Sequence, residues 1–243
     1  MTTTIEAAIR FEDVSYHAGG IRILKNITGS FPKGQITTLV GPSGAGKTSL
    51  FKLCNGLQSP CNGEIFVFEK NIDDYHPVEL RRTVGLALQQ APMISGTVLY
   101  NVALPLKLQN KRLPLKKAKE LMELVGLDET LLQRNVKKLS GGQRQKLSIA
   151  RTLVNRPKVL LLDEITSSLD KVSQQDIEQL IVKINKMYKT TIIWITHNLH
   201  QAREIGDYTW VMMDGEVIES GETSLLDCPK TERVQRFITG EER

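Results

Sequence analysis

This sequence has no long apolar run. No stretch approaches the roughly 20 hydrophobic residues that an α-helix needs to cross a bilayer. The first residues, MTTTIEAAIRFED, also lack the basic and then apolar order of a secretory signal. We therefore expect the chain to stay in the cytosol.

Cysteine is scarce and follows no pattern. The chain contains three, Cys54, Cys61 and Cys228, an odd number without the spacing of metal ligands. A disulfide framework or a zinc site would need paired or clustered cysteines. We expect reduced thiols, in keeping with a cytosolic location.

A large excess of one charge is missing as well. The 32 basic and 27 acidic residues give a formal net charge of +5, which would suit a nucleic acid or an anionic membrane surface. The basic residues are spread along the chain, however, and the densest cluster, Lys107 to Lys119, is interleaved with leucines. We favour a solvated amphipathic helix there over a partner or lipid surface, and we expect no nucleic-acid partner.

The bulk composition is that of an ordinary soluble protein. Hydrophobic residues make up 40% and charged residues 24% of the 243 residues, so neither a disordered nor a membrane class is indicated. A chain of this length can form one sizeable α/β core, or a core with a smaller attached lobe. Two full domains are not expected.

The sequence does contain a pattern for phosphate binding. Residues 41–48, GPSGAGKT, fit G-x-x-x-x-G-K-[ST]. The apolar run Ile36 to Val40 precedes them as a buried strand would, and a helical apolar face beginning at Leu50 follows. The alternative, an ordinary Gly-rich turn, does not require that context. The segment predicts phosphate contacts from Gly41, Pro42, Ser43, Gly44, Ala45, Gly46, Lys47, Thr48 and Ser49.

The residue types explain the chemistry of this loop. Glycines let backbone N–H groups curl around phosphate oxygens, and the following helix presents its positive N-terminus to them. Lys47 is predicted to reach the β- and γ-phosphates, and the Thr48 hydroxyl to ligate Mg²⁺.

The segments around this loop alternate between strands and helices. Short β-rich stretches from Ile9 to Phe31 indicate a hairpin, in which Tyr16 is either a packing residue or a ring that can stack on an adenine. Strands are predicted at 64–68 and 84–88. Gln89 follows the second of these strands, where it can orient a water or help to hold Mg²⁺, or is simply a polar loop residue.

A helical lobe interrupts this alternation. Between Ser95 and Lys138 the apolar residues recur with a helical period and no strand intervenes. The stretch LSGGQ, residues 139–143, then opens another helix, with Ser140 as a plausible N-cap. Its two glycines allow close approach of an anion, so the chain carries a second helix N-terminus suited to phosphate.

Further chemistry follows two more apolar strands. The strand from Val159 ends in Asp163 and Glu164, which can hold a Mg²⁺ shell and polarise a water, or can cap the next helix. The strand 191–196 delivers His197, which taken alone is more often a loop residue than a catalyst. A hairpin about Asp214-Gly215 and a polar helix complete the chain.

The order of these parts closely resembles the nucleotide-binding subunit of an ABC transporter, over essentially all 243 residues. Walker A corresponds to 41–48, the Q-loop glutamine to Gln89, the LSGGQ signature to 139–143, Walker B to VLLLDE ending at Glu164, the D-loop to 167–170 and the H-loop to His197. The pentapeptide between a P-loop and Walker B is the most specific of these features.

The resemblance implies an α/β fold and an enzymatic activity. The fold would be a P-loop NTPase (ABC ATPase) core with an N-terminal antiparallel β subdomain and an inserted α-helical subdomain at about residues 90–155, within one domain spanning 1–243. The cofactors would be ATP and Mg²⁺. The reaction would be in-line attack of water on the γ-phosphate.

Individual roles are implied in the same way. Glu164 would be the general base, His197 would hold the γ-phosphate and the base, and Gln89 would couple the site to the helical lobe. Tyr16 would stack on adenine. The Mg²⁺ ligands would be Thr48, Gln89 and Asp163.

The resemblance also implies partners. Two copies, or one copy and a relative, would sandwich two ATP molecules head to tail. Nucleotide contacts in trans would come from Ser140, Gly141, Gly142 and Gln143, and Asp170 of the D-loop would be among the nucleotide-binding residues. A separate permease would dock near Gln89 to Leu106 and hold the subunit at the cytoplasmic face of the membrane. An ABC protein acting on ribosomes or nucleic acid, and a P-loop kinase, are the alternatives.

One departure points to a branch of the family. Pro usually follows Walker B, as in DEPTSALD, whereas Ile165 gives DEITSSLD here. Together with the Gln-Gln-Ala-Pro loop, this looks like the iron-export (Fet-type) ATPases and their plant aluminium-tolerance relatives. The stretch 101–106 is also similar to phosphate and methionine importer subunits. These likenesses indicate ancestry and do not identify the cargo.

Overall fold

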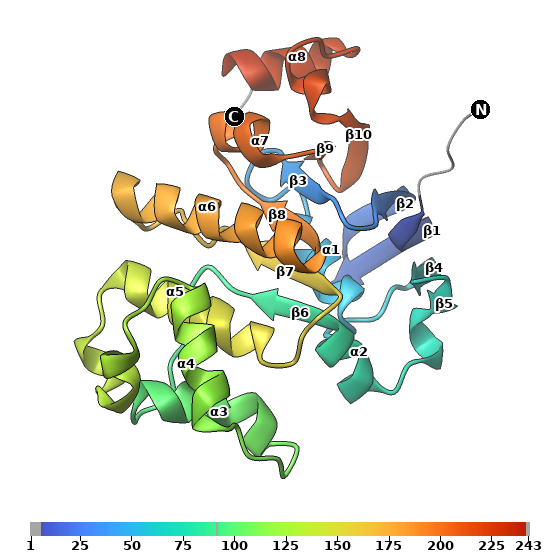
Figure 1. Ribbon diagram of the computed structural model, residues 1–243. Helices are drawn as coiled ribbons and strands as arrows, with labels where there is room; N and C mark the ends of the chain where they lie inside the picture. Colours follow the sequence, from blue (N-terminus) through green and yellow to red (C-terminus); the bar gives the residue numbers. More distant parts are fainter. Residues whose placement is uncertain (1–5, 91, 242–243) are drawn as a thin grey trace.

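The computed structural model describes residues 6–90 and 92–241. Two β-sheets lie side by side and a helical lobe extends from one end (Figure 1). This arrangement confirms the α/β class with an antiparallel β subdomain and an inserted helical subdomain. Ala91 of the Gln-Gln-Ala-Pro loop and the first and last residues of the chain lie outside the described residues.

The first sheet is antiparallel and has the strand order β2-β1-β4-β5. Its strands are β1 (Ala7–Ala18), β2 (Ile21–Pro32), β4 (Asn62–Val67) and β5 (Lys70–Asn71). β1 and β2 pair along most of their length, so the predicted N-terminal hairpin is confirmed.

The second sheet has the order β10-β9-β3-β8-β7-β6, and its five strands from β9 to β6 are parallel. Its strands are β3 (Ile36–Val40), β6 (Val84–Ala87), β7 (Val159–Asp163), β8 (Thr191–Ile195), β9 (Tyr208–Met213) and β10 (Glu216–Glu222). Every residue of β3, β7 and β8 is buried, as expected for strands covered on both faces. The hairpin about Asp214-Gly215 is confirmed by the β9–β10 pairing.

Helices cover the second sheet and build the lobe (Figure 1). The α-helices are α1 (Lys47–Cys54), α2 (Pro77–Thr83), α3 (Val98–Lys107), α4 (Leu115–Leu124), α5 (Gly141–Leu153), α6 (Lys171–Tyr188), α7 (Leu199–Ile205) and α8 (Glu232–Thr239). The 3₁₀ turns within the described residues are η1 (Ile72–Asp74), η2 (Glu129–Gln133), η3 (Val136–Lys138) and η4 (Thr223–Leu226). Among the described residues, no helix combines the length and apolar character needed to cross a membrane.

The hydrophobic core joins these layers. One cluster of buried side chains runs from the lobe, with Met122 and Leu147, to Leu162 and Trp194 of the sheet. A second cluster joins the two sheets, and there the Trp210 ring of β9 lies 4.5 Å from the Phe31 ring of β2, centroid to centroid. The lobe and the antiparallel sheet are therefore both anchored on the parallel sheet.

Two short helices, α2 and α7, were not predicted. Each has seven residues, fewer than two full turns with a clear apolar period. Their starts are defined by caps instead, since the His76 side chain accepts a hydrogen bond from the Val78 N–H and Asn198 Oδ1 accepts one from the Gln201 N–H. Such caps are local hydrogen bonds that an apolar pattern does not reveal.

Gly41 connects β3 to the phosphate loop at a very close approach of two backbones. Its φ is +143°, and a Cβ atom there would lie 1.9 Å from the carbonyl oxygen of Met212 in the neighbouring strand β9. Only glycine fits this position without displacing β9.

We predict that Gly41→Ala lowers the free energy of unfolding by several kcal/mol, because backbone strain and overpacking each cost about 1–3 kcal/mol. Gly44→Ala is the matched control in the same loop. Its φ is also positive but nothing lies within 4 Å of the added Cβ, so it should cost only about 1–2 kcal/mol. Urea unfolding followed by tryptophan fluorescence measures both, and equal losses would contradict the close approach.

Candidate nucleotide site

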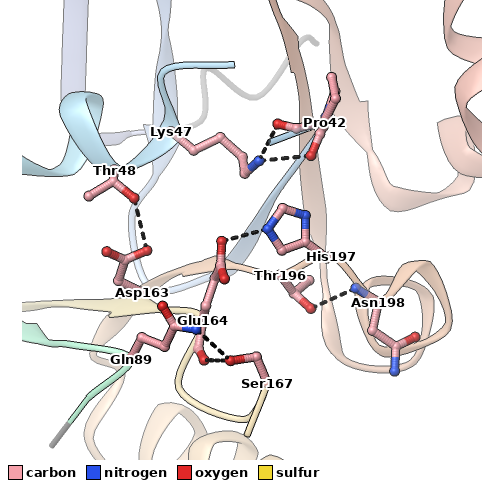
Figure 2. A network of polar contacts seen from close by, with 11 residues as sticks. Pro42, Lys47, Thr48, Gln89, Asp163, Glu164, Ser167, Thr196, His197 and Asn198 are labelled. Atoms are coloured by element: carbon pink, nitrogen blue, oxygen red, sulfur yellow. Dashed lines mark hydrogen bonds and ion pairs between the residues drawn. The ribbon is translucent and has the colours of Figure 1, made fainter. Parts of the chain in front are cut away.

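Three adjacent parallel strands deliver the candidate site. Thr38 of β3 pairs with Trp194 of β8, and Leu162 of β7 pairs with the same residue. The carboxyl ends of the three strands therefore lie at one edge of the sheet. The segments that follow them carry the phosphate loop, the Asp163–Glu164 pair and His197, which Figure 2 shows grouped together.

Lys47 is the buried cation of this group. Its ammonium donates hydrogen bonds to the carbonyl oxygens of Gly41 and Pro42, at 2.7 and 2.8 Å, and the residue is only 5% exposed. Burial lowers the pKa of Lys47 to about 8, although the negative charges of Glu164 and Asp163 act in the opposite direction. The lysine is held inside the loop that it is predicted to serve.

The other loop residues surround Lys47 as the motif requires. Ser43 and Gly44 are exposed, whereas Ala45 is packed in the core. Gly46 occupies the N-cap of α1 in a left-handed conformation, without a side-chain cap. Ser49, in the first turn of α1, is half-buried. The first N–H groups of α1 therefore face no capping side chain, which suits an anion.

Thr48 and Asp163 lie against each other across the site. The Thr48 hydroxyl donates a 3.2 Å hydrogen bond to Asp163 Oδ1. Burial raises the pKa of Asp163, and the nearby charge of Glu164 adds to this, while the Thr48 hydrogen bond opposes it.

This pair fits Mg²⁺ as a partial ligand set. A hydroxyl and a carboxylate are hard oxygen donors of the type that Mg²⁺ prefers, and the remaining ligands of this ion are commonly waters and substrate phosphates. No cluster of three or more His, Cys, Asp or Glu side chains suited to a metal occurs in the part of the chain that the structure describes.

Glu164 and His197 form a short polar contact in the site. Glu164 Oε1 lies 2.6 Å from His197 Nε2. An ionised carboxylate can only accept, so this contact is a hydrogen bond in the tautomer that carries its proton on Nε2. Glu164 has a left-handed backbone, with φ 49°, and its N–H donates to the Ile195 carbonyl at the end of β8. A non-glycine residue held in this conformation is typical of functional sites.

A chain of hydrogen bonds links Gln89 to Glu164. Gln89 Nε2 donates to Ser167 Oγ, and Ser167 Oγ donates to the carbonyl oxygen of Glu164, each at 3.0 Å (Figure 2). Gln89 follows β6 at the entrance of the lobe, so these bonds connect that entrance to the Glu164 backbone through Ser167. No described hydrogen bond joins Gln89 to Thr48 or Asp163, its predicted partners as Mg²⁺ ligands.

His197 is positioned by the turn between β8 and α7. The Asn198 N–H donates to the Thr196 hydroxyl at 3.0 Å, and the Asn198 side chain caps α7. Behind this turn, the buried Gln201 side chain donates to Thr166 Oγ1 and to Glu178 Oε1. These bonds tie the His197 turn to the segment after Glu164.

Tyr16 lies one strand away from the phosphate loop. It is half-buried on β1 and pairs with Leu24 of β2. The Leu24 side chain contacts the position of Gly46, where an added Cβ would approach it to 2.7 Å. Tyr16 therefore lies on the pair of strands that flanks the phosphate loop. This position is compatible with packing of the ring against the protein and with stacking of the ring on a base.

The start of α5 is a capping box, so the predicted Ser140 N-cap is confirmed. Ser140 Oγ accepts from the Gln143 N–H, and Gln143 Oε1 accepts from the Ser140 N–H. Of the first N–H groups of α5, those of Gly141 and Gly142 are left as donors among the described hydrogen bonds. Of the four residues predicted to contact the nucleotide in trans, Ser140 and Gln143 therefore bond to each other, whereas Gly141 and Gly142 offer backbone N–H groups.

The signature segment packs beside the D-loop and not beside the phosphate loop of its own chain. A Cβ on Gly142 would lie 2.9 Å from Ser173 Oγ, and Asp170 caps α6 by accepting from the same Ser173. Within the described residues no hydrogen bond or ion pair joins 140–143 to 41–48. The N-termini of α1 and α5, which are both suited to bind phosphate, therefore lie apart within one copy of the chain.

The sequence pattern did not reveal Ser167, Thr196, Asn198 and Gln201 as parts of the site. They act by holding other site residues, and common polar residues in this role carry no motif of their own. Ser167 had the best signal, because it lies in the SSLD stretch that was matched to the D-loop. Ile165, which replaces the usual Pro, is 1% exposed and packed in the core, away from the polar groups of the site.

Comparison with known proteins agrees with this geometry. A family model described as "ABC transporter" matches residues 24–167. The chain is 42% identical over 238 residues to the putative ABC transporter ATP-binding protein YjkB of Bacillus subtilis (strain 168), an alignment that covers 96% of this chain and 94% of that protein.

Solved structures give the same result. CbiO1 from Clostridium perfringens, part of the ABC transporter complex cbiONQ, superimposes with a TM-score of 0.83 at 30% identity, covering 93% of this chain and 92% of that chain. The ATP-binding cassette MJ0796, in a dimeric post-hydrolysis state bound to ADP and Pi, gives 0.78 at 30% identity, covering 88% and 98%.

We predict that ATP affinity falls above pH 8, where the free protein begins to lose the Lys47 proton. Bound phosphates raise the pKa of this ammonium, so binding above pH 8 must take up a proton, and the dissociation constant should rise by up to about tenfold per pH unit. Well below pH 8 the lysine is charged in both states, so its titration should no longer change the affinity. Calorimetric titrations from about pH 7 to 9.5 measure this effect.

Lys47→Arg is the control for this pH dependence, because a guanidinium keeps its charge throughout that range. Its ATP affinity should not vary with pH above 8, whatever its absolute value. The same slope in the native protein and in this variant would show that another group titrates.

Proposed function

The chain belongs to the ABC transporter family and is an ATP-binding subunit that works with a membrane permease, and we propose that it hydrolyses ATP to ADP and phosphate to drive transport. The observation that carries this proposal is the convergence of Lys47, the Thr48–Asp163 pair and the Glu164–His197 pair at the ends of three adjacent strands. The alternative of a soluble ABC protein acting on ribosomes or nucleic acid has no support among these relatives.

The proposed reaction is attack of water on the γ-phosphate, with Glu164 as the general base. A base must lie within hydrogen-bond reach of the water and be oriented by a further group, and His197 supplies that orientation through its 2.6 Å contact with Glu164. Lys47 and the first N–H groups of α1 would hold the phosphates, and Tyr16 would stack on the adenine. Positioning and charge stabilisation provide most of the catalysis in phosphoryl transfer.

Thr48 and Asp163 would hold the Mg²⁺ ion, directly or through water, with Gln89 as a further ligand once the lobe moves. The ion would neutralise charge that develops on the β- and γ-phosphate oxygens. The Gln89–Ser167–Glu164 chain supports a coupling role for Gln89, because it connects the lobe to the backbone of the proposed base.

The complete site needs a second copy of the chain. Ser140, Gly141, Gly142 and Gln143 would contact the γ-phosphate bound to the other copy, with the N–H groups of Gly141 and Gly142 as ready donors. Asp170, exposed beside them, would face the same interface. The dimeric structure of the MJ0796 cassette bound to ADP and Pi supports a site that two copies share.

A groove between the core and the lobe would receive the permease. It has a volume of about 480 Å³ and is lined by α2 and β6 on one side and by α3 and α5 on the other. Val78 and Leu108 on its walls are 44% and 78% exposed, while Arg81, Arg82 and Arg151 supply positive charge. An amphipathic permease helix would bury these apolar side chains, and would hold the subunit at the cytoplasmic face of the membrane. The cargo would be determined by the permease.

We predict that Glu164→Gln binds ATP with nearly native affinity but hydrolyses it at least about 100-fold more slowly, because it removes the general base. The variant should accumulate ATP-bound dimers. Phosphate release, ATP binding and light scattering measure the three properties. Glu204→Gln is the matched control, since Glu204 is exposed on α7 and outside the site. Near-native turnover in Glu164→Gln would remove Glu164 from the role of base.

A mixing experiment tests the shared site. Lys47→Ala disables the phosphate loop and Ser140→Arg disables the signature, so each variant alone should be inactive. Random mixing should form mixed dimers with one intact site each, and should recover about a quarter of native activity in a two-fold symmetric assembly. No recovery in spite of dimerisation would argue that each site is built from one copy.

A further inference from the structure

A cavity of about 470 Å³ opens at the edge of the parallel sheet opposite to the nucleotide site. Lys33, Lys158 and Thr190 line it, and they come just before β3, β7 and β8, respectively. The nucleotide-site residues come just after the same strands. Helix α4 of the lobe closes one side of the cavity. Its volume is in the range of about 300–1,000 Å³ that is usual for small-molecule pockets.

The interior of the cavity is apolar. Leu121 and Leu124 of α4 and Leu153 of α5 line it from the lobe, and Phe68 and Tyr188 line it from the core. Tyr188, the last residue of α6, is 56% exposed and presents its ring to the cavity. An apolar body that entered the cavity would cover the exposed part of Tyr188 and the half-buried Phe68 and Leu124, and would gain hydrophobic stabilisation.

The charged residues that line the cavity are all positive: Lys33, Lys117, Arg156, Lys158 and Lys189, with no Asp or Glu among the lining residues. Two of them are paired, Lys33 with Glu6 at 2.7 Å and Lys117 with Glu120 at 3.1 Å. The other three make no ion pair with any described residue. The Lys158 ammonium lies 5.4 Å from the centroid of the Phe68 ring, at the border between the charged rim and the apolar interior.

Three of the lining residues have a backbone conformation that favours glycine. Phe68, Arg156 and Lys189 have φ values of 48°, 51° and 52°. A left-handed conformation costs a residue with a side chain roughly 1–2 kcal/mol relative to glycine. Large side chains in these three turns are therefore unfavourable for local stability, and their presence around one cavity indicates a use for the side chains themselves.

We propose that this cavity binds a small amphiphilic anion, with its acidic head among Arg156, Lys158 and Lys189 and its aliphatic or aromatic body against the leucines of α4 and α5. The site is separate from the nucleotide site and does not depend on ATP hydrolysis. A free carboxylate amphiphile and the head of an anionic lipid share this chemistry.

Decanoate is the first probe. Acetate, which has only the acidic head, and decanol, which has the aliphatic body without the charge, are the comparison ligands. Calorimetry on the full chain should show decanoate binding at least about tenfold more tightly than either fragment, since both halves of the cavity contribute. Sedimentation with phosphatidylcholine vesicles, with or without phosphatidylglycerol, separates the two sources. Binding to the anionic vesicles that is lost in the variants below assigns the head to a lipid, and decanoate binding alone assigns a free amphiphile.

Arg156→Gly with Lys189→Gly tests the site without damaging the fold. Both substitutions relieve a left-handed backbone, so the urea midpoint should stay the same or rise, while decanoate binding should weaken at least about tenfold with the loss of two charged donors. Lys183→Gln with Lys186→Gln removes the same number of charges from exposed positions of α6 outside the cavity. This control should bind decanoate as the native chain does.

Several results would overturn the proposal. They are the absence of decanoate binding, equal binding of decanol and decanoate, native affinity in the Arg156 and Lys189 double variant, or an equal loss in the α6 control. The last of these would mean that decanoate responds only to net charge.

Discussion

The parallel register of β3, β7 and β8 is the constraint on which the site depends. Each of the three strands has five residues, all of them buried. Because the strands pair in parallel with aligned ends, the polar residues that follow them emerge at one edge of the sheet. Lys47, Glu164 and His197 come from segments far apart in the sequence. They meet because hydrophobic burial aligns the strands, and the hydrogen bonds of the site then refine their positions.

The features that could be predicted from the sequence are those with a periodic or motif signal. β3 has the predicted bounds, and the Ser140 cap and the hairpin about Asp214 were found because local residue types specify them. The short helices α2 and α7 were missed because caps, and not a period, define them. In the site, the Glu164–His197 contact and the link through Ser167 depend on tertiary distances between strand ends, which no spacing along the chain contains.

The two edges of the parallel sheet differ in chemistry. At the carboxyl edge, Lys47 donates to two backbone carbonyls, Asp163 accepts from Thr48 and Glu164 contacts His197. Burial shifts the pKa of Lys47 downward and that of Asp163 upward. At the amino edge, the cations surround an apolar cavity and three of them have no acidic partner among the described residues. Helix α4 reaches only the amino edge, whereas α5 extends from the signature segment to Leu153 in that cavity.

The place of β3 in the sheet also bears on how the protein is made. Ile36 pairs with Ile192, and Thr37 pairs with Tyr208, so both neighbours of this strand are translated long after it. A ribosome will have released the phosphate loop, the whole lobe and β7 before either neighbour of β3 exists. Non-local pairing of this kind is slow and leaves an edge exposed until it forms. Until β8 and β9 have been made, the phosphate loop therefore follows a strand that lacks both of its neighbours in the sheet.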